Sequence, residues 1–486
     1  MMRVEVAIVG AGFAGIGMAM ALRRAGIESS VVLERAASVG GTWRDNTYPG
    51  VACDVPSHLY CFAEHPNPDW SGLYARGDEI HRYLARVAAT EGIAPRFESP
   101  LLSAEWHAGT ERWRLRIGGP DPVELEADAL VLACGRLTEP TIPSIPGLES
   151  FAGPLFHSSR WDHTTQLDGM RVGVVGTGAS AVQLVPELHR TSHVTLFQRS
   201  PAWIVPRGAF AYSDADRARF AAHPDELARL RADLDVEGEA RFASRSGDQD
   251  AAASAVATAR AHLEAQVADP DLRRRLTPDY DFGCKRVLLS DEFYPALSSG
   301  RVHLEASALA SVEGEALIAA SGARHEVDAL VLATGFASTR QPYADLVRGE
   351  TGTLAAHWSR GMTSFGSTVV SGFPNLFVLN GPNASLGHTS SVLMIEEQAR
   401  YAARTLASRT GALHVDPAAE AGYSREIDRA AASTPWLTGG CRNWYVDERS
   451  GRLTLLWPGT VAAFRERLED ADGSEFLPTP VKRGLP

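Results

Sequence analysis

The chain has 486 residues, which is enough for two or three domains at roughly 150 residues each. Its apolar fraction of 44% and charged fraction of 22% are ordinary for a globular protein, so a disordered or fibrous chain is excluded. The formal net charge of -12 argues against a nucleic-acid-binding surface, because binding phosphates needs clustered Lys and Arg.

The first apolar stretch runs from Val4 to Leu22, is interrupted by four glycines and is followed by Arg23 and Arg24. A membrane span needs about 20 predominantly apolar residues in a row, so this stretch predicts a strand, a turn and a helix instead. It also lacks the form of a signal peptide. We therefore expect a cytoplasmic protein without a membrane span.

The five cysteines are scattered along the chain and include no CxxC pair: Cys53, Cys61, Cys134, Cys284 and Cys441. This pattern predicts neither a disulfide framework nor a zinc site, and no other metal site is expected.

Residues 4–34 have the pattern of a dinucleotide-binding unit. An apolar strand leads into Gly10, Gly12 and Gly15, a helix follows, and a second strand ends at Glu34. In such a turn the first glycine permits the bend, the second admits a pyrophosphate to the backbone N–H groups, and the third lets helix and strand pack. An acid at the end of the second strand accepts hydrogen bonds from a ribose diol. The pattern predicts a bound dinucleotide.

A second unit of this kind covers residues 172–198, with Gly176, Gly178 and Ala181 in its turn. Its second strand is followed by Arg199 and Ser200 and by no carboxylate. An Arg at this place can pair with the 2′-phosphate of NADP, which an acid would repel, although a solvated surface charge is the alternative for Arg199. Two different nucleotides are therefore expected, FAD in the first unit and NADPH in the second.

Residues 128–135 and 328–335 repeat one another, each an apolar strand that runs into a glycine, and we expect them to close the two units. The predicted fold class is α/β, with two Rossmann-like dinucleotide-binding domains and a helical insertion in the NADP domain. The expected divisions are an FAD domain in residues 1–147, an NADP domain in 148–336 with the insertion at about 208–280, and the rest of the FAD domain in 337–486.

The segment between the two units carries a more specific pattern, made by Phe151, Gly153, His157, Trp161 and Asp162. It is similar to the FxGxxxHxxxW(P/D) fingerprint of the type I Baeyer-Villiger monooxygenases, which are flavin-dependent class B monooxygenases. From the residues alone, a packed, hydrogen-bonded anchor is the favoured interpretation of His157 and Trp161. The resemblance implies a hinge at which His157 couples movements of the two nucleotide domains.

Further segments resemble the same family, namely residues 40–50 with Asp54, the pair Lys285 and Arg286, residues 381–388, and Trp444 with Tyr445. The resemblance implies that Lys285 reaches the 2′-phosphate, Arg286 sits over the flavin with Asp54 near its reactive edge, and Trp444 contacts the nicotinamide nucleotide. The cofactor-binding residues expected from the turns and the resemblance are Gly10, Gly12, Phe13, Ala14, Gly15, Glu34, Arg35, Gly41, Thr42, Trp43, Tyr48, Asp54, Tyr60, Gly176, Thr177, Gly178, Ser180, Ala181, Arg199, Ser200, Lys285 and Trp444. The chain departs from the family in being short and in having Ala181 as the third residue of the second turn.

The resemblance implies an enzyme that converts ketones to esters or lactones with NADPH and O2 through a flavin C4a-peroxide. The peroxide anion and the tetrahedral adduct are both negative, so a fixed cation serves both, and Arg286 is the catalytic candidate. Asp54 is expected to orient it, the alternative being a plain structural salt bridge. The expected partners are a small ketone and O2, without nucleic acid, and the chain is expected to be a monomer or homodimer.

Three other functions share some of these features. A flavin monooxygenase that oxygenates nitrogen or sulfur shares both turns, but the set of Asp54, Lys285, Arg286 and the linker fingerprint favours the Baeyer-Villiger reaction. A flavin disulfide reductase needs a dithiol, which the spacing of Cys53 and Cys61 does not provide. A nucleotide-binding sensor without activity would not need Arg286 and Asp54.

Overall fold

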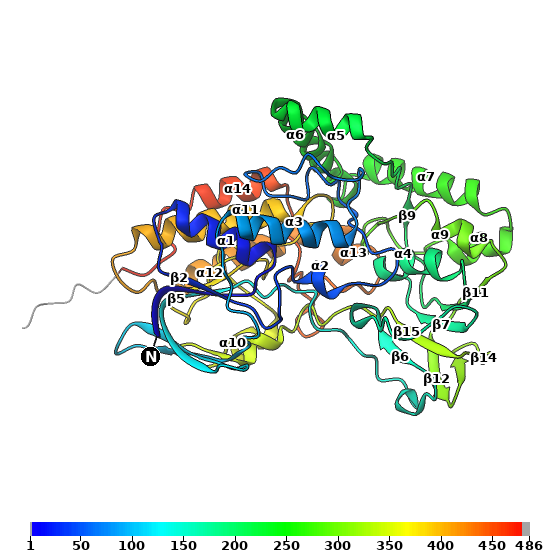
Figure 1. Cartoon of the computed structure of the whole chain (residues 1–486), viewed down its shortest axis with the longest axis horizontal. Helices are drawn as coiled ribbons and strands as arrows, with labels where there is room; N and C mark the ends of the chain where they lie inside the picture. Colours follow the sequence, from blue (N-terminus) through cyan, green and yellow to red (C-terminus); the bar gives the residue numbers. More distant parts are fainter. Residues whose placement is uncertain (1, 479–486) are drawn as a thin grey trace, which may run out of the picture.

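The computed structural model describes residues 2–478, and its two largest sheets lie at opposite ends of the molecule (Figure 1). The first has seven strands in the order β16-β3-β4-β5-β1-β2, with β17 also pairing with β5. Strand β4 is antiparallel to both of its neighbours, while β1 is parallel to β2 and β5. The strands are β1 (Met2–Val9), β2 (Ser30–Leu33), β3 (Leu101–His107), β4 (Arg112–Ile117), β5 (Val123–Leu132), β16 (Val347–Arg348) and β17 (Leu376–Val378).

Strand β5 joins early and late parts of the chain. Its first half pairs with β4 and its second half with β17, so residues 376–378 lie beside residues 130–132. Ala129 to Leu132 are all fully buried, because helices cover one face of the sheet and the C-terminal segments cover the other. Helices α1 (Phe13–Arg24), α3 (Gly77–Thr90) and α11 (Ser391–Ser408) lie on one face and α10 (Leu354–His357) lies towards the other (Figure 1).

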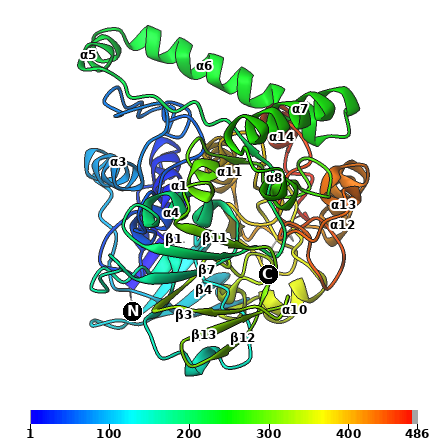
Figure 2. The ribbon, with the colours of Figure 1, turned by 90° about the vertical axis from the view of Figure 1, so that its right-hand side faces the viewer.

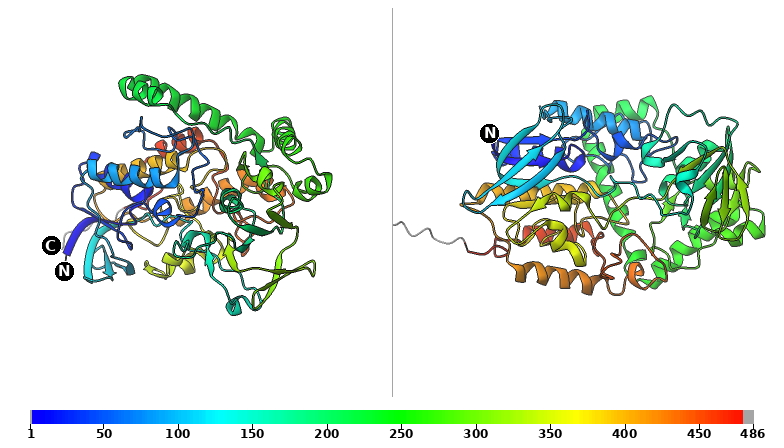
Figure 3. Two further views of the ribbon diagram at one scale, coloured as in Figure 1. Left: turned by 45° about the vertical axis from the view of Figure 1, so that its right-hand side comes forward. Right: turned by 90° about the horizontal axis from the view of Figure 1, so that it is seen from below.

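The second sheet has five parallel strands in the order β11-β8-β7-β15-β6. A small antiparallel sheet of β12, β13 and β14 lies beside it, at the far end of the molecule from the first sheet (Figure 3). The strands are β6 (Leu155–His157), β7 (Arg171–Val175), β8 (His193–Phe197), β11 (Val302–Glu305), β12 (Leu309–Glu313), β13 (Ala316–Ala319), β14 (Arg324–Glu326) and β15 (Ala329–Leu332), and β9 (Ile204–Val205) pairs separately with β10 (Leu288–Leu289). Two Rossmann-type units are thus present, which confirms the predicted fold class.

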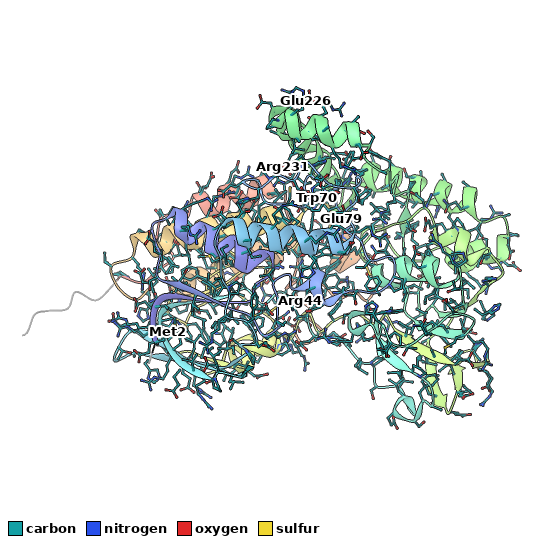
Figure 4. The ribbon with its side chains drawn as sticks, viewed as in Figure 1. Met2, Arg44, Trp70, Glu79, Glu226 and Arg231 are labelled. Carbon is teal, nitrogen blue, oxygen red and sulfur yellow. A yellow bond between two sulfur atoms is a disulfide. The ribbon has the colours of Figure 1, made fainter. Side chains whose placement is uncertain are left out.

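The predicted helical insertion is confirmed as four helices, α5 (Asp214–Ala222), α6 (Pro224–Ala240), α7 (Gln249–Gln266) and α8 (Pro270–Leu276). Helices α5 and α6 extend away from the second sheet and over the helices of the first part of the chain (Figure 2). Glu226 stands at the outer end of α6, and Arg231 lies further along its underside (Figure 4). Arg231 donates to the carbonyls of His58 (3.0 Å) and Cys61 (2.9 Å) and lies 3.6 Å from the carboxylate of Glu396.

The remaining helices are short or C-terminal: α2 (Thr42–Asp45), α4 (Ala179–Leu188), α9 (Phe293–Leu297), α12 (Pro417–Ala431), α13 (Pro435–Thr438), α14 (Val461–Glu469) and the 3-10 turns Leu148–Ser150, Ser158–Arg160, Ala243–Arg245, Pro342–Asp345 and Trp358–Arg360. Among residues 2–478, no helix combines the length and the apolar character that crossing a membrane requires.

We expect Arg231→Met to lower the free energy of unfolding by on the order of 2–3 kcal/mol, because it removes charged hydrogen bonds to two carbonyls and leaves Glu396 without its cation. Urea or thermal unfolding measures the change. Arg229→Met, at an exposed position of the same helix, serves as the control and should change stability little. Equal effects of the two substitutions would show that Arg231 does not fasten the insertion.

Candidate active site

A single cavity of about 1540 Å³ extends between the two large sheets and is lined by both glycine turns. Pockets for one small ligand usually measure about 300–1,000 Å³, so this cavity has room for two dinucleotides. The turns follow β1 and β7, so the cavity lies at the carboxyl ends of parallel strands, where ligands of open α/β sheets bind.

The first turn is built from close backbone approaches. Gly10 has φ +110°, and a Cβ added there would lie 2.4 Å from the carbonyl oxygen of Ala133; a Cβ at Gly15 would lie 1.8 Å from that of Gly10. At Gly12 an added Cβ would meet only Gly41, at 3.8 Å. Gly10 and Gly15 therefore close the turn, while Gly12 leaves room for a ligand over the start of α1.

Glu34 is buried beside this turn. Its carboxylate accepts hydrogen bonds from the N–H groups of Ala11 and Ala36, both at 2.9 Å, and pairs with Arg44 at 3.1 Å. Glu34 thus fixes the turn that it borders, and its predicted contact with a ribose remains a prediction. Arg35 points to the cavity edge and pairs with Glu139 at 2.5 Å.

The predicted flavin-proximal residues line the same cavity as Phe13 and Ala14 of α1. Trp43 donates to the hydroxyl of Tyr60 (3.3 Å), and Tyr48 donates to Gln183 of α4 (2.9 Å), which links the first segment to the second unit. Burial raises the pKa of Tyr48 to about 12 and raises that of Tyr60 further, so both hydroxyls stay protonated. Gly41 and Thr42 complete this wall.

The second turn repeats the geometry of the first. A Cβ at Gly176 would lie 2.5 Å from the carbonyl oxygen of Ala333, whereas one at Gly178 would meet no atom within 4 Å. Ala181 is fully buried in the apolar core of this unit, so its methyl group packs and does not narrow the turn. Thr177 and Ser180 line the cavity, and the Thr177 hydroxyl donates to the carbonyl of Ser200 (3.0 Å).

Two cations lie at the end of β8, where the sequence predicted a 2′-phosphate. Lys285 donates to the Ser200 hydroxyl (2.5 Å) and lies over the ring of Tyr280, and it shares the cavity wall with Arg199. Burial, and then Arg199, lowers the pKa of Lys285. Neither cation forms an ion pair with a carboxylate of residues 2–478, so their charges are free for an anion.

Arg286 and Asp54, which are far apart in sequence, meet in the cavity. The Nε and Nη2 atoms of Arg286 lie 2.8 Å and 2.7 Å from Oδ2 of Asp54. Asp54 raises the pKa of Arg286 above its already high value, so the guanidinium stays charged. Tyr445 is buried next to them; burial raises the pKa of its hydroxyl, and Arg286 opposes that rise.

A disulfide joins Cys284 to Cys441, so the prediction that the scattered cysteines form no disulfide is wrong for this pair. Spacing rules could not identify it, because the two cysteines are 157 positions apart. Cys284 precedes Lys285, and Cys441 precedes the cavity-lining residues 442–446. The bond therefore ties the segment of the catalytic candidate to the segment of Trp444, whose indole is partly exposed and packs on Tyr445.

The linker fingerprint belongs to the second unit, where His157 lies on the edge strand β6. A Cβ at Gly153 would lie 2.2 Å from the carbonyl of Asp328, Trp161 packs edge-on against Phe156, and Asp162 accepts hydrogen bonds from Thr164 and Thr165. Phe151 packs against the core of the second unit.

His157 is buried at the end of β6 and contacts Phe336, which follows β15. Burial lowers its pKa to about 4, so the imidazole is neutral at pH 7. These contacts fit the interpretation of His157 as an anchor, and the hinge role stays a prediction.

The sequence-based list omitted cavity residues that the fold brings in from afar, notably Arg136, Gln183 and Tyr445. Arg136 directly follows the repeated strand-to-glycine motif, at the place that Phe336 takes in the second copy. This replacement of an aromatic residue by a cation is the feature of the sequence that could have identified Arg136 as a cavity residue.

One group of possible metal ligands lies outside the cavity lining. Side-chain atoms of His303, Glu305 and His325 are within 4.8 Å of one another, and the ring of His325 contacts Glu305 at 3.0 Å. His303 and Glu305 lie on β11 and His325 lies on β14, so the sequence, from which no metal site was expected, does not show that the three come together.

Two glycine turns that face one cavity, together with a half-buried Arg–Asp pair, define an oxidoreductase that binds two dinucleotides. The family model described as "FMO-like: Flavin-binding monooxygenase-like" matches residues 3–213. A Baeyer-Villiger monooxygenase of Streptomyces coelicolor is 44% identical, over 99% of this chain and 94% of the relative, and one of Pseudomonas aeruginosa is 38% identical, over 97% and 91%. The chain therefore belongs to the Baeyer-Villiger monooxygenase family.

Solved structures agree with this placement. Oxidized steroid monooxygenase bound to NADP superimposes with a TM-score of 0.84 at 27% identity, and cyclohexanone monooxygenase from Rhodococcus sp. Phi1 bound to NADP+ with 0.87 at 24%. Each covers 98% of this chain and 99% of the other. The comparisons confirm the predicted family, enzyme class and cofactors, FAD and NADP.

Gly178→Ala adds a methyl group where the structure has open space, so the protein should fold and retain FAD. The methyl should keep the NADPH pyrophosphate from the backbone and raise the KM for NADPH about 10-fold, equivalent to ~1.4 kcal/mol. Steady-state kinetics and the flavin-to-protein absorbance ratio measure this. Gly109→Ala, where the added Cβ also meets no atom within 4 Å, is the control outside the cavity. An unchanged KM in Gly178→Ala would remove the second turn from the NADPH site.

We expect thiol titration of denatured, unreduced protein to find three free thiols among the five cysteines. The double variant Cys284→Ser/Cys441→Ser should lose about 2–4 kcal/mol of stability and form less oxygenated product per NADPH consumed, because the two cavity segments are no longer joined. Cys61→Ala, which leaves the bond intact, is the control. Five free thiols in the unreduced protein would contradict the pairing.

Proposed function

We propose that this chain converts ketones to esters or lactones with NADPH and O2, and that Arg286 and Asp54 are its catalytic pair. The observation that carries the proposal is the position of that pair on the cavity shared by both glycine turns. The side chains of Arg286 and Asp54 are 29% and 25% exposed, so both face the cavity while remaining sheltered from bulk water.

The cavity fits the two cofactors on the evidence of its own residues. Gly12 and Gly178, the glycines that would face the pyrophosphates, are the positions at which an added Cβ finds space, whereas Gly10 and Gly176 are closed by neighbouring backbone. When bound, FAD would accept hydride from NADPH and supply activated oxygen. Arg199, Ser200 and Lys285 would hold the 2′-phosphate, whose charge their two cations match.

Arg286 would stabilise the negative charge that develops on oxygen when a ketone is attacked. Asp54 occupies the Nε and Nη2 side of the guanidinium, and within residues 2–478 the Nη1 atom has no hydrogen-bond partner. Nη1 is therefore the donor left for an oxyanion in the cavity. Asp54 fixes the plane of the guanidinium and keeps it charged, which makes Asp54 a positioning residue as well as a counter-ion.

An enzyme that oxygenates nitrogen or sulfur is the second candidate, since it needs the same nucleotide sites. A fixed cation favours ketone oxidation, because attack on a carbonyl requires an anionic oxygen nucleophile and yields an anionic adduct, whereas a soft sulfur needs neither. The Arg286–Asp54 pair is thus the feature that separates the two.

The proposal includes the wider setting of the enzyme. We infer a division into residues 1–147, 148–336 and 337–486, supported by the strands that 347–378 add to the first sheet. We also propose that the chain is a cytoplasmic monomer or homodimer. Its three free cysteines fit a reducing compartment, whereas the Cys284–Cys441 disulfide is a bond that such compartments rarely retain.

Arg286→Ala should lower ester or lactone formation by about 10²- to 10³-fold while FAD stays bound, because one preorganised oxyanion donor is lost. The purified yellow protein is incubated with NADPH, 18O2 and a broad panel of ketones, and products are identified by gas chromatography and mass spectrometry. Arg404→Ala, a surface charge outside the cavity, is the control. If the wild type consumes NADPH but yields only hydrogen peroxide, N-oxides or sulfoxides, the N- or S-oxygenating function replaces this one.

A further inference from the structure

Arg136 is a buried cation that the proposed reaction does not use. It is 8% exposed, and in the described chain it forms no ion pair with a carboxylate. Its guanidinium donates to three neutral groups, the side-chain oxygens of Asn380, Ser385 and, at 3.5 Å, Ser391, and its Nε–H has no partner. A buried charge without a counter-ion costs several kcal/mol, so its retention calls for an anion that arrives from outside.

The arginine is held rigidly in place. Asn380 has φ +54°, which is uncommon for a residue other than glycine, and its N–H donates to the fully buried side chain of Gln398 (2.9 Å). Ser385 is fixed through backbone hydrogen bonds to Leu455 and Trp457. A strained, well-braced residue that orients a cation is typical of a binding site.

The amino end of helix α11 is a second source of positive potential beside Arg136. Helix α11 begins at Ser391, and the Ser391 hydroxyl lies 3.5 Å from the guanidinium of Arg136. The amino end of this 18-residue helix carries a partial positive charge, and anions bind favourably there. The arginine charge and the helix end thus converge on one wall of the cavity, and the Nε–H of the same guanidinium is buried there without a partner.

The carboxylates of the cavity wall already have cationic partners, and the 2′-phosphate has its own pair of cations. In the cavity wall, Glu34 accepts a hydrogen bond from the first turn and pairs with Arg44. Glu139 pairs with Arg35, and Glu448 pairs with Arg442. Asp54 is engaged by Arg286, and Arg199 with Lys285 would take the 2′-phosphate. Arg136 has Arg286, Tyr60 and Tyr445 as electrostatic neighbours, so it lies at the reacting end of the cavity and away from the 2′-phosphate cations.

We propose, building on the Baeyer-Villiger function above, that Arg136 and the amino end of α11 form a subsite for a substrate carboxylate, so that the enzyme prefers ketones with a remote carboxylate. The oxo acid would place its ketone near Arg286 and its carboxylate beside the guanidinium of Arg136, where the hydroxyls of Ser385 and Ser391 add donors. Burial lowers the pKa of Arg136 to about 10, which still leaves it charged at pH 7.

The test compares substrates that differ only in the charge. Methyl-ketone fatty acids from 4-oxopentanoate to 9-oxodecanoate are assayed on the holoenzyme beside the neutral methyl ketones of equal carbon number. For the best chain length, the wild type should have the higher kcat/KM with the acid. Arg136→Gln should reduce the acid-to-ketone ratio of kcat/KM by about 10- to 100-fold, whereas Arg136→Lys should retain part of the preference.

Binding without turnover gives an independent readout. Decanoate is titrated into the holoenzyme and its binding is followed by the change in the flavin absorption spectrum; its dissociation constant should rise about 10- to 100-fold in Arg136→Gln. Arg404→Gln, which removes a surface charge of the same part of the chain, should leave the dissociation constant of decanoate and the acid-to-ketone ratio unchanged. Flavin content and thermal unfolding identify any variant that fails to fold, and Arg136→Lys then carries the comparison.

The results separate a failure of the carboxylate subsite from a failure of the Baeyer-Villiger function. If Arg136→Gln weakens acid and neutral ketone equally, or shifts the flavin midpoint potential without changing the ratio, Arg136 serves the fold or the cofactor and the subsite is wrong. A wild type that oxygenates neutral ketones but no oxo acid also overturns it while leaving the Baeyer-Villiger function in place. If no ketone of either kind is oxygenated but decanoate still binds through Arg136, the proposed function fails and the anion subsite stands.

Discussion

The site depends on backbone approaches that no side chain would permit. Gly10 packs against the end of β5, and Gly176 packs against the end of β15, with an imagined Cβ only 2.4 Å and 2.5 Å from the carbonyl oxygens there. Each contact packs the glycine turn against the neighbouring strand end of the same sheet, and this packing fixes where the following helix begins. Because both turns open into one cavity, these contacts also set the distance between the two nucleotides and the place of the residues between them.

Positive charge accumulates around Arg286, between the two glycine turns, and is only partly neutralised. Arg136 and Arg245 each interact electrostatically with Arg286, and the carboxylate of Asp54 is in direct contact with Arg286. Burial lowers the pKa of both Arg136 and Arg245 to about 10, whereas Asp54 raises that of Arg286. An environment of this kind stabilises anions, as a reaction with a negatively charged intermediate requires.

Much of the fold follows from local sequence patterns. The strand, glycine turn and helix of each unit are encoded within about 35 residues, where periodicity and turn chemistry suffice, and the repeated motifs at 128–135 and 328–335 identified β5 and β15. The position of Arg286 beside Asp54 was inferred from a family resemblance, not from spacing. No local pattern could bring Arg136 to Asn380 and Ser385, or Cys284 to Cys441, because such contacts exist only once the last third of the chain has returned to the first sheet.

The sulfur bridge also changes the connectivity of the molecule. It closes residues 284–441 into a covalent ring that contains β15 of one large sheet and β17 and α11 of the other. A protease that cuts once inside this ring would release no fragment until the bridge is reduced. Each large sheet thus has at least one strand within the covalent ring. A single backbone cut anywhere in the ring leaves the two sheets covalently joined.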